Sequence, residues 1–204
     1  MKLDFPKKLF LIFLLIWIIT FINPPSRIDN LIENIIVFIF LPIVLLSYYK
    51  FRLSNFSYFL IFIFGVLHIT AAHYGYWNTP WGNWFKDVLD WERNHYDRMV
   101  HFLFGFLMTP VFVDLLKKYL PSNRLMAGVF VFGVIFSIGS FYEIAEFVAG
   151  LLLKPEAGLS FLGFQGDIWD TQKDMIMQGT GSVLSFFVFK SFIIRFIKNQ
   201  ENKL

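Results

Sequence analysis

Cysteine is absent from this chain of 204 residues. Disulfide bonds, thiolate metal sites and cysteine nucleophiles are therefore excluded, and any chemistry must come from carboxylates, histidines, hydroxyls or amides. Net charge is also small, at +3. Because Lys and Arg in membrane proteins mainly set topology, we expect no nucleic-acid partner.

Hydrophobic residues make up 56% of the chain and aromatic residues 21%, and the mean hydropathy is +0.58. A soluble fold does not hide that much apolar surface. A transmembrane helix needs roughly 20 mainly apolar residues. Six stretches approach or meet that length, and they predict an all-α bundle of about six transmembrane helices: Leu9–Asn23, Asn34–Tyr49, Ser57–Trp77, Met99–Leu116, Leu125–Leu153 and Asp174–Phe196.

The first stretch follows Lys2, Lys7 and Lys8, as the apolar part of a signal peptide would. The residues after it, Asn23–Ser26, offer no small-residue cleavage site, so we expect a retained anchor. No repeat or low-complexity tail appears, which predicts one membrane domain over residues 1–204. Basic residues are more numerous on the side that holds the N-terminus, and the positive-inside rule then predicts that both termini are cytoplasmic.

Tryptophans gather among polar residues between the third and fourth stretches, at positions 77, 81, 84 and 91. Amphipathic aromatic side chains favour the headgroup level of a membrane. We therefore predict a short interfacial or re-entrant helix over Trp81–Asp90. The alternative is an aromatic belt without a specific ligand.

Ionisable and amide side chains from four of the predicted spans fall at one depth, near the outer face. They also form pairs three or four residues apart, which share a helix face: Asp97 with His101, Glu143 with Glu146, and Asp174 with Gln178. Each carboxylate costs about 2.5–3.5 kcal/mol at the centre of a membrane helix, so such groups usually point into the bundle and pair. Bound protons, trapped water or a divalent cation must neutralise the excess acid.

These residues predict an outward-facing polar site. The expected roles are catalytic for Asp97, Arg98 and Asp170; divalent-metal ligation for His73, His101, Glu143, Glu146 and Asp174; and substrate binding for Gln165, Asp167, Trp169 and Gln178. Taken singly, each residue also has a structural interpretation. Asp97 and Arg98 suit the start of a helix, His101 suits a hydrogen-bonded position inside a bundle, and Asp167 and Asp170 suit a helix cap. No His-Glu-x-x-His zinc motif is present.

Three segments carry a resemblance to a known family: Tyr96-Asp97-Arg98-Met99-Val100-His101-Phe102, then Tyr142-Glu143-Ile144-Ala145-Glu146, then the run from Leu162 to Met175. They resemble the signature blocks of the YjdF-like bacterial inner-membrane family. The resemblance implies a membrane fold in the inner membrane and a shared polar site, but no established reaction. More distantly, Asp97-Arg98 with His101, and Asp174 with Gln178 and Gly181, are similar to VanZ-like proteins. Glu146 departs from that pattern, which has an amide there.

Three functional hypotheses follow. The first is a membrane hydrolase or transferase, dependent on a divalent metal, that acts on a lipid or lipid-linked substrate. The second is a proton-coupled transporter or permease. The sequence shows no second set of acids near the cytoplasmic face, although Gln178, Thr180, Ser182 and Ser185 offer a polar track. The third is a binding or scaffold protein whose polar network fixes helix packing, aided by small residues at positions 133, 139, 140, 179, 181 and 182.

Overall fold

The computed structural model describes residues 3–121, 123–152 and 165–201, and every regular element in those ranges is a helix. The predicted all-α fold is therefore confirmed. The elements are α1 (Phe5–Thr20), α2 (Arg27–Lys50), α3 (Asn55–Tyr74), the 3-10 turn η1 (Tyr76–Asn78), α4 (Pro80–Val88), α5 (Tyr96–Leu116), α6 (Arg124–Leu152), α8 (Asp170–Val188) and α9 (Lys190–Glu201).

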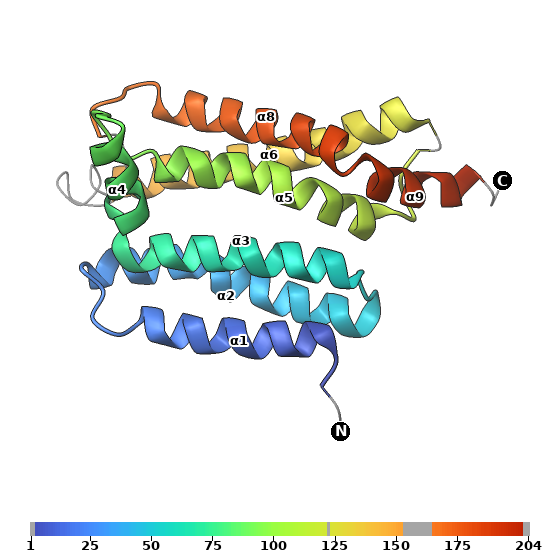
Figure 1. The fold of residues 1–204 in the computed structure, drawn as a ribbon, viewed down its shortest axis with the longest axis horizontal. Helices are drawn as coiled ribbons and strands as arrows, with labels where there is room; N and C mark the ends of the chain where they lie inside the picture. The colour runs from blue at the N-terminus through green and yellow to red at the C-terminus, as the bar shows by residue number, and fades with distance from the viewer. Residues whose placement is uncertain (1–2, 122, 153–164, 202–204) are drawn as a thin grey trace.

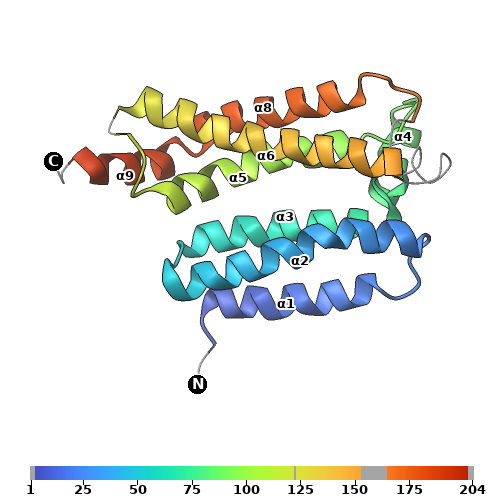
Figure 2. The same ribbon diagram turned by 180° about the vertical axis from the view of Figure 1, so that it is seen from behind.

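The long helices run up and down along one axis, with α1, α2 and α3 on one side and α5, α6 and α8 on the other (Figures 1 and 2). Helix α4 lies across one end of this bundle (Figure 1). Both ends of the chain lie at the opposite end. That both termini are cytoplasmic stays a prediction.

Four helices are long and apolar enough to cross a membrane, namely α2, α3, α5 and α6, and a fifth span is formed if α8 and α9 are taken together. Helix α1 has 16 residues. At about 1.5 Å per residue it is about 24 Å long, shorter than a hydrocarbon core of about 30 Å. The chain is a polytopic helical membrane protein, with four or five spans by length and composition in its described part.

The last predicted span, Asp174–Phe196, is not one straight helix. Helices α8 and α9 meet at 81° around Phe189. The ring of Phe189 packs on Phe56 and Phe106, at centroid distances of 5.5 and 5.1 Å, and so holds the turn against α3 and α5. The apolar residues continue through the bend, so the hydropathy of the sequence does not reveal it. Lys190 lies inside the span predicted over Asp174–Phe196, and in the structure it is the first residue of α9.

Helix starts are fixed by capping side chains. Ser26 accepts from the N–H of Asp29 at the start of α2, and Ser54 accepts from the N–H of Ser57 at the start of α3. Asp114 of α5 is fully buried and connects α5 to the start of α3. Its carboxylate accepts from the Ser54 N–H at 2.7 Å and from the Ser57 hydroxyl at 2.8 Å. Asp114 is thus a carboxylate near the predicted cytoplasmic face, where the sequence indicated no second set of acids.

Helices α5 and α8 have the most extensive contact of any helix pair in the described residues. They run parallel, both starting at the α4 end (Figure 1). A Cβ on Gly105 would collide with the carbonyl oxygen of Gln178, and a Cβ on Gly181 with that of Phe102. The two backbones therefore touch, as small residues in membrane helices allow. The packing role predicted for Gly181 is borne out by this contact, whereas Gly133 has no neighbour within 4 Å of its would-be Cβ and does not share it.

Helix α4 covers most of the segment predicted as an interfacial helix, and its position across the bundle end agrees with that prediction. Thr79 precedes it and is fully buried, and Pro80 occupies its first turn. Large apolar side chains on α4 are exposed: Trp81, Trp84, Phe85 and Val88. The short helix thus presents an aromatic face at the end of the bundle where α5 and α8 begin.

Candidate functional site: an aspartate cluster with two arginines

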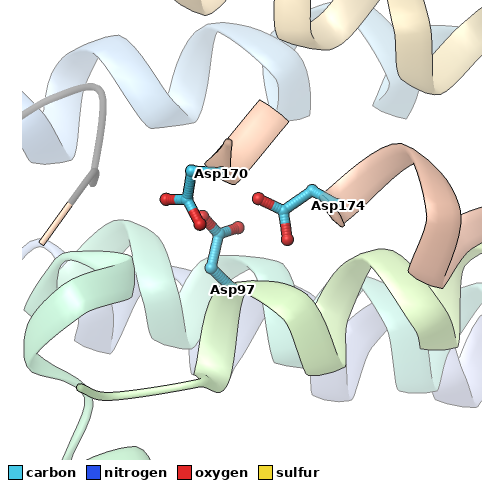
Figure 3. Close-up of side chains that lie close together, drawn as sticks. All are labelled: Asp97, Asp170 and Asp174. Carbon is cyan, nitrogen blue, oxygen red and sulfur yellow. The ribbon is translucent and has the colours of Figure 1, made fainter. Parts of the chain in front are cut away.

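Three aspartates meet where α5 and α8 begin. Asp97 lies in the first turn of α5, and Asp170 and Asp174 lie in the first two turns of α8. All three are buried, and one carboxylate oxygen from each lies within 4.8 Å of the others. Figure 3 shows the three carboxylates pointing toward one another. The parallel course of α5 and α8, in contact through Gly105 and Gly181, brings these first turns together. We call the three residues the aspartate cluster.

Two arginines neutralise one member of this cluster. Arg93 donates from Nη1 and Nη2 to the two carboxylate oxygens of Asp170, at 2.6 and 3.0 Å. Arg98 donates from Nη2 to Asp170 Oδ1 at 3.1 Å. A guanidinium that donates to a carboxylate from two of its nitrogens is among the strongest charge-assisted arrangements in proteins. Asp97 and Asp174 have no such arginine contact among the described interactions.

The ion pairs continue outward to Asp167. Its Oδ2 accepts from Arg98 and, at 2.6 Å, from Lys173 Nζ, and Arg93 Nη1 lies 3.7 Å away. These contacts hold the pKa of Asp167 well below its usual range, with the hydrogen bond from Lys173 the largest favourable cause. The Lys173 side chain is 46% exposed and that of Asp167 18% exposed. The polar site therefore reaches the surface at the bundle end.

A pair of amides fastens the segment around Gln165 to the residues before α5. The side chain of Gln165 accepts from the main-chain N–H of Asn94 and donates to its carbonyl, both at 2.9 Å. The Asn94 amide in turn donates to Thr79 O and Asn83 Oδ1 of the α4 region. Gln165, predicted to bind substrate, thus has both polar groups engaged in this connection, which holds Arg93 above Asp170.

His101 lies one turn deeper than Asp97 on α5. Its Nε2 is 3.0 Å from Glu143 Oε1 of α6 and 3.5 Å from Asp97 Oδ1. The Glu143 oxygen has no aligned hydrogen bond in spite of this short separation. Gln178 lies below, donates from Nε2 to Ile135 O at 2.7 Å and packs against Gly139. The predicted convergence of His101, Glu143 and Gln178 on Asp97 and Asp174 is found in the structure.

His73 does not join the site. Its Nδ1 lies 2.8 Å from the carbonyl oxygen of Thr20, so it connects α3 to the end of α1. A predicted depth in the membrane does not say which neighbouring helix a side chain meets. Trp169 is exposed and packs on none of the aspartates, although its N–H donates to Asp167 Oδ1. Glu146 is half-buried and close enough to Asp97 and Glu33 to interact with them electrostatically.

Two charged residues at this end of the bundle, Arg93 and Glu33, are not among the predicted site residues. The pairing of Arg93 with Asp170 depends on a contact across 77 positions. Glu33 of α2 is buried and accepts from the Tyr142 hydroxyl at 3.2 Å. The second span is predicted to begin at Asn34, one residue after Glu33, whereas α2 begins at Arg27. A carboxylate beside the start of an apolar stretch was the available signal.

Negative charge remains in excess after these pairings. Arg93 and Arg98 form their ion pairs with Asp170 and Asp167. Asp97 and Glu143 lie beside His101 instead. Asp174 Oδ1 is buried and has no hydrogen-bond partner, and Asp174 as a whole is 2% exposed. A buried charged oxygen without a partner is costly. The arrangement is suited to binding a divalent cation or protons.

Comparison with known proteins agrees with the sequence blocks. A family described as "Predicted membrane protein (DUF2238)" matches residues 5–195. The chain is 30% identical over 182 residues to the inner membrane protein YjdF of Escherichia coli strain K12. The aligned residues cover 89% of this chain and 87% of that protein. No solved structure matches. The resemblance to YjdF-like proteins is thereby confirmed, and the chain belongs to the DUF2238 family of membrane proteins.

Proposed function

We propose that this protein is a hydrolase or transferase of the bacterial inner membrane that uses a divalent cation and acts on a lipid or lipid-linked substrate. The observation that carries the proposal is the aspartate cluster, in which the carboxylate of Asp174 faces those of Asp97 and Asp170 (Figure 3). The Oδ1 atom of Asp174 is also buried and has no hydrogen-bond partner. Carboxylate oxygens are the ligands that Mg²⁺, Mn²⁺ and Ca²⁺ prefer. Oxygens within 4.8 Å of one another suit a common cation, since oxygen ligands lie about 2.0–2.6 Å from such ions.

The proposed ligand set differs from the one predicted from sequence. Asp97 and Asp174 would hold the cation, and Asp170 would contribute an oxygen while it stays paired with Arg93 and Arg98. His73 is too far along α3 to take part, because it bonds to Thr20. His101 lies beside the cluster rather than in it, with Glu143 at its Nε2.

His101 is the candidate general base. A cation held by the aspartate cluster would supply Lewis-acid chemistry there, by polarising the scissile ester and stabilising negative charge on it. His101 then accepts a proton from the attacking water or acceptor hydroxyl, and Glu143 and Asp97 stabilise the imidazolium that results. Paired acidic and basic groups of this kind contribute typically about 10²–10⁴-fold to a rate.

A lipid substrate is favoured by where the site opens. Its exposed members Asp167 and Lys173 lie at the bundle end that α4 crosses, and α4 presents Trp81 and Trp84 there. Indole rings of this kind favour the headgroup region. The opposite end carries Lys50, Arg52, Lys117 and Arg124 near its helix ends. By the positive-inside rule, these basic residues support a site at the outer leaflet and termini in the cytoplasm.

Elemental analysis tests the cation. We expect detergent-purified protein, equilibrated with Mg²⁺, Mn²⁺ or Ca²⁺ and then desalted, to retain close to one equivalent of a divalent ion by mass spectrometry. Asp97→Asn and Asp174→Asn should lose it, because each removes a negatively charged ligand. His101→Ala should keep the ion and lose turnover of lipid phosphoesters, since its role is that of base.

The matched control is Asp87→Asn, which removes an exposed carboxylate from α4 at the same end of the protein. It should bind the ion as the unaltered protein does. A folded protein that holds no divalent ion at millimolar concentration would refute the metal-dependent reaction.

A second function is supported by the polar contacts below the site. Gln178 is followed along α8 by Ser182, whose hydroxyl lies 2.8 Å from that of Thr109, and by the buried hydroxyl of Ser185. Thr180 does not belong to this track, because it is exposed and bonds to its own helix. These hydroxyls continue toward the end that holds Asp114, and they suit a proton relay. Proton uptake by proteoliposomes that is lost in Ser182→Ala would favour transport over catalysis.

A further inference from the structure

Three cationic side chains converge on a single oxygen atom of the protein. Asp167 Oδ2 accepts from Arg98 Nη2 and from Lys173 Nζ at 2.6 Å, and Arg93 Nη1 lies 3.7 Å from it. They come from separate places: the segment before α5, the first turn of α5 and the first turn of α8. We call Arg93, Arg98 and Lys173 the cation cradle.

The anion in this cradle belongs to the connection before α8, not to a helix. Asp167 follows Gln165 and Gly166, which have positive φ angles of 42° and 86°. Among the described residues, the Trp169 N–H alone adds a hydrogen bond to the other carboxylate oxygen, Oδ1, at 3.1 Å. The carboxylate is also partly exposed. An external anion can therefore reach the cradle by displacing Asp167, while α5, α8 and the segment before α5, which carry the three cations, stay where they are.

We propose that the cation cradle binds the phosphate group of an anionic lipid headgroup, and that Asp167 occupies the cradle when no lipid is bound. Guanidinium groups bind phosphate with two parallel hydrogen bonds, and a lysine ammonium adds a point charge. A phosphodiester has the same single negative charge as a carboxylate and offers more acceptor oxygens. The exchange thus keeps the charge balance of the site.

A lipid, rather than free phosphate, is indicated by the residues beside Asp167. Ile168 is 82% exposed and Trp169 is 59% exposed, and both follow Asp167 directly in the chain. The aromatic face of α4 lies at the same bundle end (Figure 1). A headgroup phosphate in the cradle would therefore have apolar side chains beside it, which suits the glycerol and upper acyl region of a lipid.

The cradle adjoins the proposed reaction centre. Arg98 Nη2 contacts both Asp167 and Asp170, so a phosphate that replaces Asp167 lies next to the aspartate cluster. In naming the substrate class, this inference rests on the proposed function. Binding in the cradle itself needs no divalent cation, which allows the two proposals to be tested apart.

Calorimetric titration of the full-length protein in an uncharged detergent provides the test. The ligands are dihexanoyl phosphatidylglycerol and inorganic phosphate, each with and without a chelator. We expect Asp167→Asn to bind the lipid at least about tenfold more tightly than the unaltered protein, because the internal competitor loses its charge. Arg98→Gln and Lys173→Gln should each weaken binding by about tenfold or more. Inorganic phosphate should bind more weakly than the lipid throughout.

Lys86→Gln is the matched control, since it removes a lysine from α4 at the same end without touching the cradle. Equal lipid affinity in Asp167→Asn and in the unaltered protein would overturn the proposal, as would equal weakening by Lys86→Gln and Lys173→Gln. Lys173 is on the surface, so its variant tests the cradle even if Arg98→Gln does not fold. Inorganic phosphate that binds as tightly as the lipid would overturn the lipid assignment. Lipid binding that survives chelation and Asp174→Asn in a protein without metal would uphold the cradle while refuting the metal-dependent reaction.

Discussion

Replacement of Asp170 with leucine is expected to destabilise the protein by about 3–5 kcal/mol, the usual cost of removing one partner from a buried ion pair. The loss is large because Arg93 and Arg98 both donate to this carboxylate, and neither the Asp170 nor the Arg93 side chain is more than 8% exposed. Unfolding in mixed micelles of detergent and dodecyl sulfate, followed by tryptophan fluorescence, measures the change in free energy.

The double variant Arg93→Met with Asp170→Leu supplies the control for this prediction. Because it removes both charges and retains side-chain volume, it should recover a large part of the stability lost in Asp170→Leu. If the double variant is as unstable as the sum of the two single variants, the ion pair between Arg93 and Asp170 does not exist as described.

Gly181→Ala and Gly105→Ala are expected to give the second large effect. Each added Cβ meets a backbone atom of the facing helix, so α5 and α8 must move apart, at about 1–3 kcal/mol for overpacking. The same movement separates Asp97 from Asp170 and Asp174. Both variants should therefore lose stability in mixed micelles and, in the elemental analysis, lose the divalent ion as well.

Gly133→Ala is the matched comparison. It makes the same change on α6, where the new Cβ has nothing within 4 Å. It should leave ion binding unchanged and stabilise the helix by about 0.5–1 kcal/mol, the usual difference between alanine and glycine in a helix. Equal losses in Gly133→Ala and Gly181→Ala would contradict the close packing of α5 on α8.

The sequence predicted the membrane fold well because length and hydropathy are local properties. Each of the six expected spans lies largely on described helices. The span predicted over Leu125–Leu153 ends at a residue that lies outside the described residues. The bend at Phe189 was missed because it depends on rings of α3 and α5 that hydropathy does not register. The first span was predicted over Leu9–Asn23, whereas α1 runs over Phe5–Thr20, because the apolar residues Phe21 and Ile22 continue past the end of the helix.

The candidate site was predicted in part. Depth and helix-face arguments correctly united Asp97, His101 and Glu143 with Asp174, but they also included His73, whose face meets α1 instead. Spacing along the chain could not assign roles to these residues. The contact between α5 and α8 decides which side chains meet, and that contact depends on which glycines face each other. The pairing of Arg93 with Asp170 was not available from local pattern for the same reason.

The order of helices along the chain has a consequence for biosynthesis. Arg93 precedes its partner Asp170 by 77 residues, which a ribosome adds in about 4–15 s at about 5–20 residues per second. During that interval α5 enters the membrane with Asp97, Arg98 and His101 lacking every contact that α8 later provides. The nascent protein must therefore shelter these groups beside the insertion machinery until its last span arrives. A chain truncated before α8 would expose them to lipid and be a natural target for membrane proteases.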